Sequence, residues 1–333
     1  MKLLVLIYLS LSTLSHAWEV DLKKEIEKMD HDFPGEIGVV IKNLRDGTIL
    51  KYNDNKKWYL SSTIKVIIGI SLLKKVEQGK INLNQKITLK EKDFVDGGGV
   101  LIWSKPGKKF TVGEILKAMI RESDNTAADI LINQIGVKEL NFDVAKWMPG
   151  TGKITSLLKV RYLAYGELHP KAQSLNNMDF ILLKNHPLEK RHEVFAEKIN
   201  VAVKDLKAND LEEAFEKYYQ HGHNSAYLAD FVSLLEKLEK RMLLSKENTN
   251  LLMKHMESMK TGDHRIKAGL SPEVKFIQKT GTQIHRACNV GLIKKSKDKA
   301  DLALAVCIRK PSENMDSDII FKKIGQKISN LVI

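Results

Sequence analysis

The sequence predicts an α/β fold in which both ends of the chain contribute to one antiparallel sheet and a helical lobe is inserted between them. Two observations support this fold. Short apolar segments, typical of strands, lie near both ends, whereas apolar stripes at helical spacing fill the middle. The chain has 333 residues, of which 43% are hydrophobic and 29% charged, so it can bury a large core and disorder is not expected.

The first seventeen residues predict export. They read MKLLVLIYLSLSTLSHA, with Lys2 before an apolar run and small residues, Ser15 and Ala17, near the end. The run is shorter than the ~20 apolar residues of a membrane span. We therefore expect a signal peptide over 1–17, cleaved near Ala17, and a mature domain over 18–333. After signal removal the protein should be periplasmic or secreted, without stable membrane insertion.

The elements follow in a definite order. After an amphipathic stretch from Val20 to Met29, segment 35–43 reads as a strand, Arg45-Asp46-Gly47 as a turn, and 48–52 as the partner strand. Apolar residues at helical spacing then predict three helices. The first begins at Ser62, and the other two contain 115–120 and 128–135.

The C-terminal third predicts three further strands, over 274–277, 290–293 and 302–308, and a final helix over 320–331. A polar turn over 294–300 joins the last two strands. Residues 138–222 are helix-like and highly charged, and they contain no motif that we can interpret.

Charge and cysteine content restrict the function classes. The formal net charge is +13, but in an exported protein a basic surface more plausibly meets anionic envelope polymers than nucleic acid. Two cysteines exclude a disulfide scaffold and a four-cysteine zinc site. Cys288 and Cys307 fall on adjacent predicted strands, where a disulfide and two buried thiols are comparable interpretations. His221 and His223 have no clustered partners, so no metal or other cofactor is expected.

Three short motifs occur in a meaningful order: Ser62-Thr-Ile-Lys65, Ser123-Asp124-Asn125 and Lys279-Thr280-Gly281. They match the S-x-x-K, S-D-N and K-T-G patterns of serine acyl-transfer enzymes. The S-x-x-K and K-T-G patterns also occur elsewhere in the chain, but there the surrounding sequence favours a structural role. Ser71 and Lys74 lie within a predicted helix, on an expected solvated face, Ser156 and Lys159 form another S-x-x-K, and Lys260-Thr261-Gly262 is expected to end a helix.

The first motif can form an activated nucleophile. Ser62 stands at the first turn of an apolar helix, and Lys65 follows on the same face. A serine hydroxyl is a weak nucleophile until a neighbour removes its proton, which a lysine with a lowered pKa can do. Helix-start amides near Ser62 offer an N–H to an oxyanion. A simple helix N-cap is the alternative interpretation of Ser62.

The other two motifs complete an acyl-transfer site. A second hydroxyl, Ser123, can relay a proton to a leaving nitrogen, and the Asn125 amide can hold an acyl side chain. An edge strand can present Lys279 and Thr280 to a substrate carboxylate, with Gly281 leaving room for the ligand. The N–H of Thr282 would be the second oxyanion donor.

The chain resembles a class A β-lactamase-type serine hydrolase, within the β-lactamase and penicillin-binding-protein superfamily. Beyond the triplets, the resemblance rests on FVDGGGVL, FTVGEILKAMIRESDNTAADILINQIG, MKTGDHRIKAGL, NVGLI and ADLALAVCI, and covers about 20–136 and 224–333. It implies a five-stranded antiparallel sheet with an all-helical lobe. It also implies that Ser62 is acylated, Lys65 is its base, Ser123 protonates the leaving nitrogen, Asn125 holds the acyl side chain, and Lys279 and Thr280 bind the carboxylate.

One family feature is absent from the sequence. Class A enzymes carry a glutamate in an E-x-x-L-N loop that activates the deacylating water, and no such motif occurs here. The corresponding zone lies in the atypical insertion, 138–222, which is roughly fifty residues longer than the family's loop. The nearest candidate base is Glu167, for which an exposed acid near a helix end is the alternative interpretation.

Three functions follow. The first is an exported, monomeric serine β-lactamase that hydrolyses β-lactams through a Ser62 acyl-enzyme and confers antibiotic resistance. The second is a penicillin-binding protein-like D,D-peptidase or slow acyl-trap acting on peptidoglycan stem peptides, which the missing glutamate favours. The third is a non-catalytic envelope-binding protein whose insertion is a partner surface.

Overall fold

The computed structural model describes residues 18–295 and 299–332. The predicted signal segment, 1–17, lies outside this range, as does part of the predicted turn 294–300. The chain divides into two compact units. Unit 1 contains the described residues up to Ser61, together with Ala226–Met242 and the chain from Gly262 onwards. Unit 2 contains Ser62–Ser225 and Leu243–Thr261.

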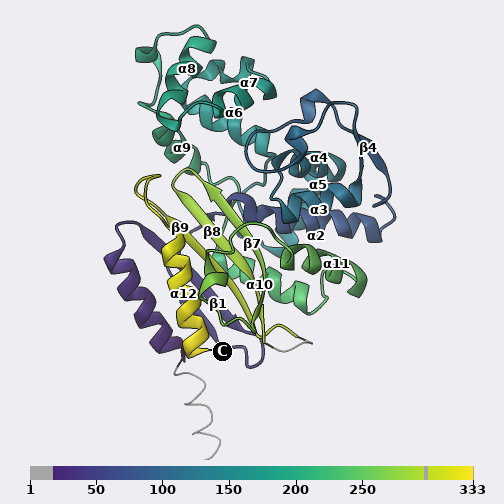
Figure 1. Ribbon diagram of the computed structural model, residues 1–333, viewed down its shortest axis with the longest axis vertical. Helices are drawn as coiled ribbons and strands as arrows, with labels where there is room; N and C mark the ends of the chain where they lie inside the picture. The colour runs from purple at the N-terminus through teal and green to yellow at the C-terminus, as the bar shows by residue number, and fades with distance from the viewer. Residues whose placement is uncertain (1–17, 296–298, 333) are drawn as a thin grey trace, which may run out of the picture. The chain divides into compact units, whose positions relative to one another are not determined.

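Unit 1 is built around the five-stranded antiparallel sheet that the sequence predicts. Its strand order is β2-β1-β9-β8-β7, so strands from both ends of the chain meet where β1 pairs with β9 (Figure 1). Most of these strands are continuous buried runs, as expected where helices cover a sheet, and β7 at the edge is longer than expected because it continues through the K-T-G segment. The strands are β1 (Glu36–Asn43), β2 (Ile49–Tyr52), β7 (Lys275–Gln283), β8 (Arg286–Lys294) and β9 (Leu302–Arg309).

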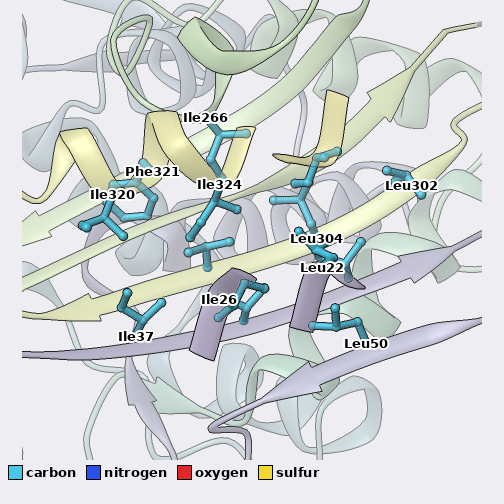
Figure 2. Close-up of a cluster of buried hydrophobic side chains, with 14 of the residues drawn as sticks. Leu22, Ile26, Ile37, Leu50, Ile266, Leu302, Leu304, Ile320, Phe321 and Ile324 are labelled. Carbon is cyan, nitrogen blue, oxygen red and sulfur yellow. The ribbon is translucent and has the colours of Figure 1, made fainter. Parts of the chain in front are cut away.

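Helices cover the sheet of unit 1. Residues 18–32 are helical, and with α12 (Asp318–Leu331) they pack on the sheet through a buried apolar cluster. Figure 2 shows Leu22 and Ile26 of the first helix and Ile324 of α12 gathered over Leu304 of β9. Helix α10 (Leu228–Glu239) also packs against β9 and β1, and the described cluster includes none of its residues.

A disulfide joins Cys288 on β8 to Cys307 on β9. The two residues are direct partners in the antiparallel register, and both are buried. The sequence left open whether the two cysteines are a disulfide or two buried thiols, and in the structure they form the disulfide.

Helix α2 (Ile64–Glu77) lies at the centre of unit 2. It is apolar on nearly every side and is buried along most of its length, as expected for a helix surrounded by others. Its contacts come from α3, α4, α5 and α11. These helices and the nearby short strands are α3 (Val112–Arg121), α4 (Asn125–Ile135), α5 (Val137–Trp147), α11 (Lys246–Glu257), β4 (Lys86–Thr88) and β5 (Lys109–Thr111). Two further short strands are β3 (Trp58–Tyr59) and β6 (Ser225–Ala226).

Two expectations about the competing motifs are wrong in detail. Ser71 is fully buried, not solvated, and its hydroxyl donates to the Asp143 carboxylate across 2.6 Å, because α2 has no solvated face there. Helix α11 ends at Glu257, so Gly262 is not its terminal glycine. These corrections do not make either motif a better candidate for the active site. Ser71 is bound to Asp143, and Lys260 forms an ion pair with Glu122.

The charged insertion is helical, as predicted. Four of its helices, drawn in teal in Figure 1, are α6 (Leu157–Leu168), α7 (Asn177–Lys184), α8 (Arg191–Lys198) and α9 (Leu211–Tyr219). Tyr165 contacts both Phe180 of α7 and Phe195 of α8, so aromatic rings form a core between these helices. None of the helices in the described part of the chain has the length and apolar character needed to cross a bilayer.

Candidate active site

Ser62 and Lys65 are held by the start of the buried helix α2. Ser62 lies in a short 3-10 turn, Ser61–Thr63, which leads directly into α2, and Lys65 is in the first turn of that helix. The Lys65 side chain is fully buried, and 3.1 Å separates its Nζ from Ser62 Oγ. The predicted pair is therefore within hydrogen-bond distance.

The S-D-N turn brings two more predicted residues to the same amine. Lys65 Nζ lies 2.6 Å from the Ser123 carbonyl oxygen, 3.4 Å from Ser123 Oγ and 2.7 Å from Asn125 Oδ1. Ser123 has a φ of +55°, a left-handed conformation that non-glycine residues adopt at a cost and that is common at functional sites. Asp124 caps α4 by accepting from the Ala127 N–H.

Burial makes Lys65 a suitable base. Desolvation lowers the pKa of Lys65 to about 7, an effect that Asp124 and Asp129 partly oppose and that Arg161 reinforces. At neutral pH a substantial fraction of this amine is therefore unprotonated.

The hydrogen-bond partners of Lys65 suit the neutral amine. A neutral amine has two N–H donors and one lone pair. The Ser123 carbonyl and Asn125 Oδ1 are both acceptors and can take the two N–H groups. The orientation of the Asn125 amide is fixed because its Nδ2 donates to the Asp96 carbonyl across 2.7 Å. Ser62 Oγ is the third neighbour of Nζ, and in the neutral amine the remaining lone pair can accept its proton.

A glycine run packs tightly against the S-D-N turn. A Cβ on Gly97 would lie 2.3 Å from Asn125 Nδ2, and one on Gly99 would lie 2.3 Å from the Asp124 carboxylate. Both glycines also have positive φ, so side chains are excluded there on two grounds. Beside them, the Asp96 carboxylate pairs with Arg161 across 2.6 Å in a buried ion pair.

Asp129 connects this group to the start of α6. Its carboxylate accepts the N–H groups of Leu157 and Leu158, across 2.6 and 2.9 Å. Burial raises the pKa of Asp129 to about 6, against the lowering effect of those two amides. The Asp129 carboxylate thus ties the first turn of α6 to α4, and it is itself close enough to Lys65 to raise the pKa of that amine.

Glu167 is not brought to this group. It lies ten residues after Leu157 on α6, which is ~15 Å along the helix axis. Its carboxylate instead meets His221 Nε2 at 3.0 Å. Among the described residues, no three histidine, cysteine or acidic side chains gather into a group that could bind a metal, this pair and His223 included.

The K-T-G residues lie in unit 1, on the edge strand β7. Lys279 is fully buried, Thr280 is nearly so, and the Lys279 ammonium donates to the Thr280 carbonyl across 2.9 Å. Arg265 supports this strand. Its guanidinium donates to the carbonyl of Gly281 and to the hydroxyl of Thr282, and it forms an ion pair with Asp318.

Sequence reasoning did not identify four of these residues: Asp96, Asp129, Arg161 and Arg265. The sequence does give one indication for Asp129, an acid directly beside the apolar residues Ala128, Ile130, Leu131 and Ile132. The run Gly97-Gly98-Gly99 also indicated a close backbone approach. Arg161 and Arg265 are visible only once distant segments are folded together.

Comparison with known proteins identifies the family. The model of the "Beta-lactamase enzyme family" matches residues 21–332. The chain belongs to the beta-lactamase enzyme family. Among solved structures, a variant of PBP-A in an acyl-enzyme complex with penicillin G covers 93% of this chain and 96% of its own, with a TM-score of 0.69 and 19% identity. The chromosome-encoded beta-lactamase of Vibrio parahaemolyticus covers 92% and 97%, with a TM-score of 0.67 and 18% identity. A variant of the reconstructed last common ancestor of Gram-negative class A beta-lactamases covers 92% of this chain and 97% of its own, with a TM-score of 0.66 and 21% identity, so the predicted fold is confirmed.

Curated members of the beta-lactamase family match over a shorter range. Beta-lactamase PSE-4 of Pseudomonas aeruginosa is 31% identical over 115 residues, which is 34% of this chain and 40% of that relative. Beta-lactamase Toho-1 of Escherichia coli is 30% identical over 121 residues, or 36% and 41%. The chain thus spans about two fifths of the length of these relatives.

Proposed function

We propose that the protein is a serine hydrolase of the β-lactamase type that forms an acyl-enzyme on Ser62. The observation that carries this proposal is the Lys65 amine, buried 3.1 Å from Ser62 Oγ, with two acceptors for its N–H groups and a pKa lowered to about 7. A serine needs such a neighbour to become nucleophilic. A helix N-cap alone would not require a buried amine.

In the acylation step, Lys65 takes the proton of Ser62 as Oγ attacks the lactam carbonyl carbon. The N–H of Ser62, at the start of α2, is the oxyanion donor that unit 2 supplies, and the N–H of Thr282 is the second donor that the K-T-G motif predicts. When the intermediate collapses, the C–N bond breaks and Ser123 delivers a proton to the leaving nitrogen. The 3.4 Å between Lys65 Nζ and Ser123 Oγ supports return of the proton by this route.

The remaining predicted residues bind the substrate. Asn125 holds the amide of the acyl side chain, and Lys279 and Thr280 bind the substrate carboxylate. Gly281 leaves room for the ligand beside the strand. Lys279 is fully buried on the edge strand, and its Nζ donates to the Thr280 carbonyl across 2.9 Å, which holds the two carboxylate-binding candidates together.

Deacylation distinguishes the two candidate activities. A β-lactamase that confers antibiotic resistance must activate a water, and Glu167 is the acid that the sequence offers. The Glu167 carboxylate pairs with His221 and not with a residue of the group around Lys65, which favours the second candidate, a D,D-peptidase or slow acyl-trap on stem peptides.

The proposal includes export. We propose that residues 1–17 direct the chain out of the cytoplasm, to the periplasm or the medium, where β-lactams and peptidoglycan stem peptides are met. The disulfide between Cys288 and Cys307 supports this proposal, since disulfides persist in oxidising compartments.

The experiment is a time course of intact-protein mass after mixing the mature protein with benzylpenicillin, with Ser62→Ala as control. An adduct that disappears while the drug is consumed identifies a β-lactamase, and Glu167→Gln then tests whether Glu167 is the base. A persistent adduct identifies the acyl-trap, and release of D-Ala from a muropeptide identifies the peptidase. No adduct with several β-lactams would overturn acylation at Ser62 and favour a non-catalytic binding protein.

A further inference from the structure

One charged residue of the insertion reaches toward the group around Lys65. Arg161 lies in the second turn of α6, within the segment for which the sequence offered no interpretation. Its side chain is nearly buried, and its Nε donates to the Asp96 carboxylate across 2.6 Å. Because Asp96 is buried as well, the two groups form an ion pair that is largely removed from water. This pair ties α6 to the loop that includes the glycine run.

Asp96 connects Arg161 to the proposed base in two further steps. The Asp96 backbone carbonyl accepts from Asn125 Nδ2 across 2.7 Å, while its side chain binds Arg161. The other end of the same amide, Asn125 Oδ1, accepts from Lys65 Nζ across 2.7 Å. A continuous chain of hydrogen bonds therefore runs from the insertion to the amine.

The orientation of the Asn125 amide decides whether it suits the neutral amine. In the observed orientation, Oδ1 accepts one of the two N–H groups of Lys65. If the amide turned over, Nδ2 would face the amine and two donors would meet. The hydrogen bond from Nδ2 to the Asp96 carbonyl prevents this as long as that carbonyl keeps its place.

The place of the Asp96 carbonyl depends on how the loop is anchored. Three glycines follow Asp96, and glycine restricts the backbone less than any other residue. Asn177 anchors the loop before this point, at the Phe94 carbonyl, and Asp124 anchors it after the glycines, at the N–H groups of residues 100 and 101. Arg161 anchors Asp96 itself.

Arg161 also acts on the amine through its charge. Burial is the main cause of the lowered pKa of Lys65, and the Arg161 guanidinium lowers it further, against the carboxylates of Asp124 and Asp129. Asp96 faces the guanidinium from the loop and offsets part of its charge. A residue that only fixed α6 in place would have no such effect on the titration of Lys65.

We propose that Arg161 is a positioning residue for acylation, which acts through Asp96 to keep Asn125 Oδ1 facing the amine. This inference rests on the proposed function, since it takes Lys65 as the base of Ser62. The effect of Arg161 is transmitted by other residues, so Arg161 is not itself catalytic. The insertion thereby contributes to the reaction.

The test compares Arg161→Met and Arg161→Lys with the original protein. The second-order rate constant for adduct formation on Ser62 with benzylpenicillin is measured by intact-protein mass from about pH 5 to pH 9. In Arg161→Met we expect the plateau rate to fall at least ~10-fold, because the Asn125 amide is no longer held. The midpoint of the profile should also move to higher pH by ~0.5 unit or more, because Lys65 loses a neighbouring cation.

Arg161→Lys tests the charge separately from the geometry. It keeps a cation at this position but replaces the planar guanidinium by an ammonium on a different stem. The midpoint should therefore stay within ~0.2 pH unit of that of the original protein, and the plateau rate should be several-fold higher than in Arg161→Met.

Two further variants separate this role from general damage. Arg161→Met combined with Asp96→Asn leaves neither charge of the pair behind, so it tests the loss of rate even if Arg161→Met alone does not fold. Arg191→Met makes the same substitution at a half-buried arginine of the insertion, which donates to the carbonyls of Lys184 and His186. It should change neither the rate nor the midpoint. Far-UV circular dichroism checks the fold of each variant.

The failure of this inference differs from that of the proposed function. If the original protein gives no adduct, acylation at Ser62 is wrong and the positioning role falls with it. If the original protein is labelled but folded Arg161→Met has the same rate and midpoint, the positioning role alone is wrong. A loss of rate with an unchanged midpoint in both Arg161 variants, or an equal loss in Arg191→Met, would reduce Arg161 to a structural residue.

Discussion

At the scale of single residues, the protonation state of Lys65 controls the proposed reaction. With its pKa lowered to about 7, the amine is mostly neutral above neutrality and charged below it. We therefore expect the acylation rate to rise ~10-fold per pH unit below about pH 7 and to level off above it. Adduct formation with benzylpenicillin, followed from about pH 5 to pH 9, measures this profile.

The control for this profile is Lys74→Ala. Lys74 lies on the same helix as Lys65, but its side chain is 40% exposed, so the profile should not change. A rate that stays flat through neutrality would contradict the assignment of Lys65 as base. The same shift has a stability consequence: between about pH 7 and 10 the unfolded chain binds the proton that folded Lys65 does not, so the unfolding free energy rises with pH.

The buried ion pair of Asp96 and Arg161 supports the site from behind. Replacing Asp96 with Ala leaves the Arg161 charge buried without that carboxylate, and should cost ~3 kcal/mol or more of unfolding free energy. Urea unfolding followed by circular dichroism measures the loss. The control is Lys190→Ala, which breaks the exposed ion pair with Glu193 and should change the unfolding free energy by less than ~1 kcal/mol. Equal losses in the two variants would show that the buried pair is no more important for stability than the exposed one.

Single residues also mark the limit of what the sequence predicts. Ser62, Lys65, Ser123 and Asn125 could be found because each belongs to a short motif whose spacing carries its chemistry. Asp96 and Arg161 could not, because they are 65 positions apart and meet only after folding. Glu167 was proposed only because the E-x-x-L-N motif is missing. In the structure its carboxylate pairs with His221 and not with the group around Lys65.

At the scale of elements, the covalent link between β8 and β9 is the most testable feature. The disulfide closes a loop with a sequence separation of 19 residues, for which the loss of chain entropy predicts ~3 kcal/mol of stabilisation. We expect the double variant Cys288→Ser, Cys307→Ser to lose ~3 kcal/mol of unfolding free energy, measured by urea unfolding. Intact mass should rise by two hydrogens on reduction of the original protein, and no rise would disprove the bond.

Helices and strands could be predicted where a local apolar pattern is typical of a single type of element. Strands β1 and β9 are continuous apolar runs that could be located within a residue or two, whereas β7 and β8 extend well beyond the segments predicted for them, and helices α3 and α4 show clear apolar stripes. Helices α6 to α9 could be recognised as helix-like but not interpreted, because their core consists of aromatic pairs such as Tyr165 and Phe195, which no local spacing identifies. The position of helix α7 was not predictable either, because it depends on the hydrogen bond from Asn177 to the carbonyl of Phe94, a residue far away in the sequence.

At the scale of the whole molecule, export is the remaining testable expectation. If residues 1–17 form a signal peptide, the chain recovered from an exporting bacterial host should begin at Trp18, and N-terminal sequencing or intact mass measures this directly. Replacing Ala17 with Arg should block cleavage and leave the longer chain, because the cut requires a small residue there. Recovery of an uncleaved original chain would contradict the prediction.

The pairing of β1 with β9 has a consequence for the order of events during synthesis. Val40 lies opposite Ala305, so a strand made at the beginning must wait for one made near the end, and β9 is also the central strand of the sheet. Until the ribosome has completed β9, the sheet can be no more than separate hairpins with unpaired, apolar edges. Folding of unit 1 is therefore postponed until translation is almost finished, and a chain held unfolded for that long remains threadable through a narrow secretion channel.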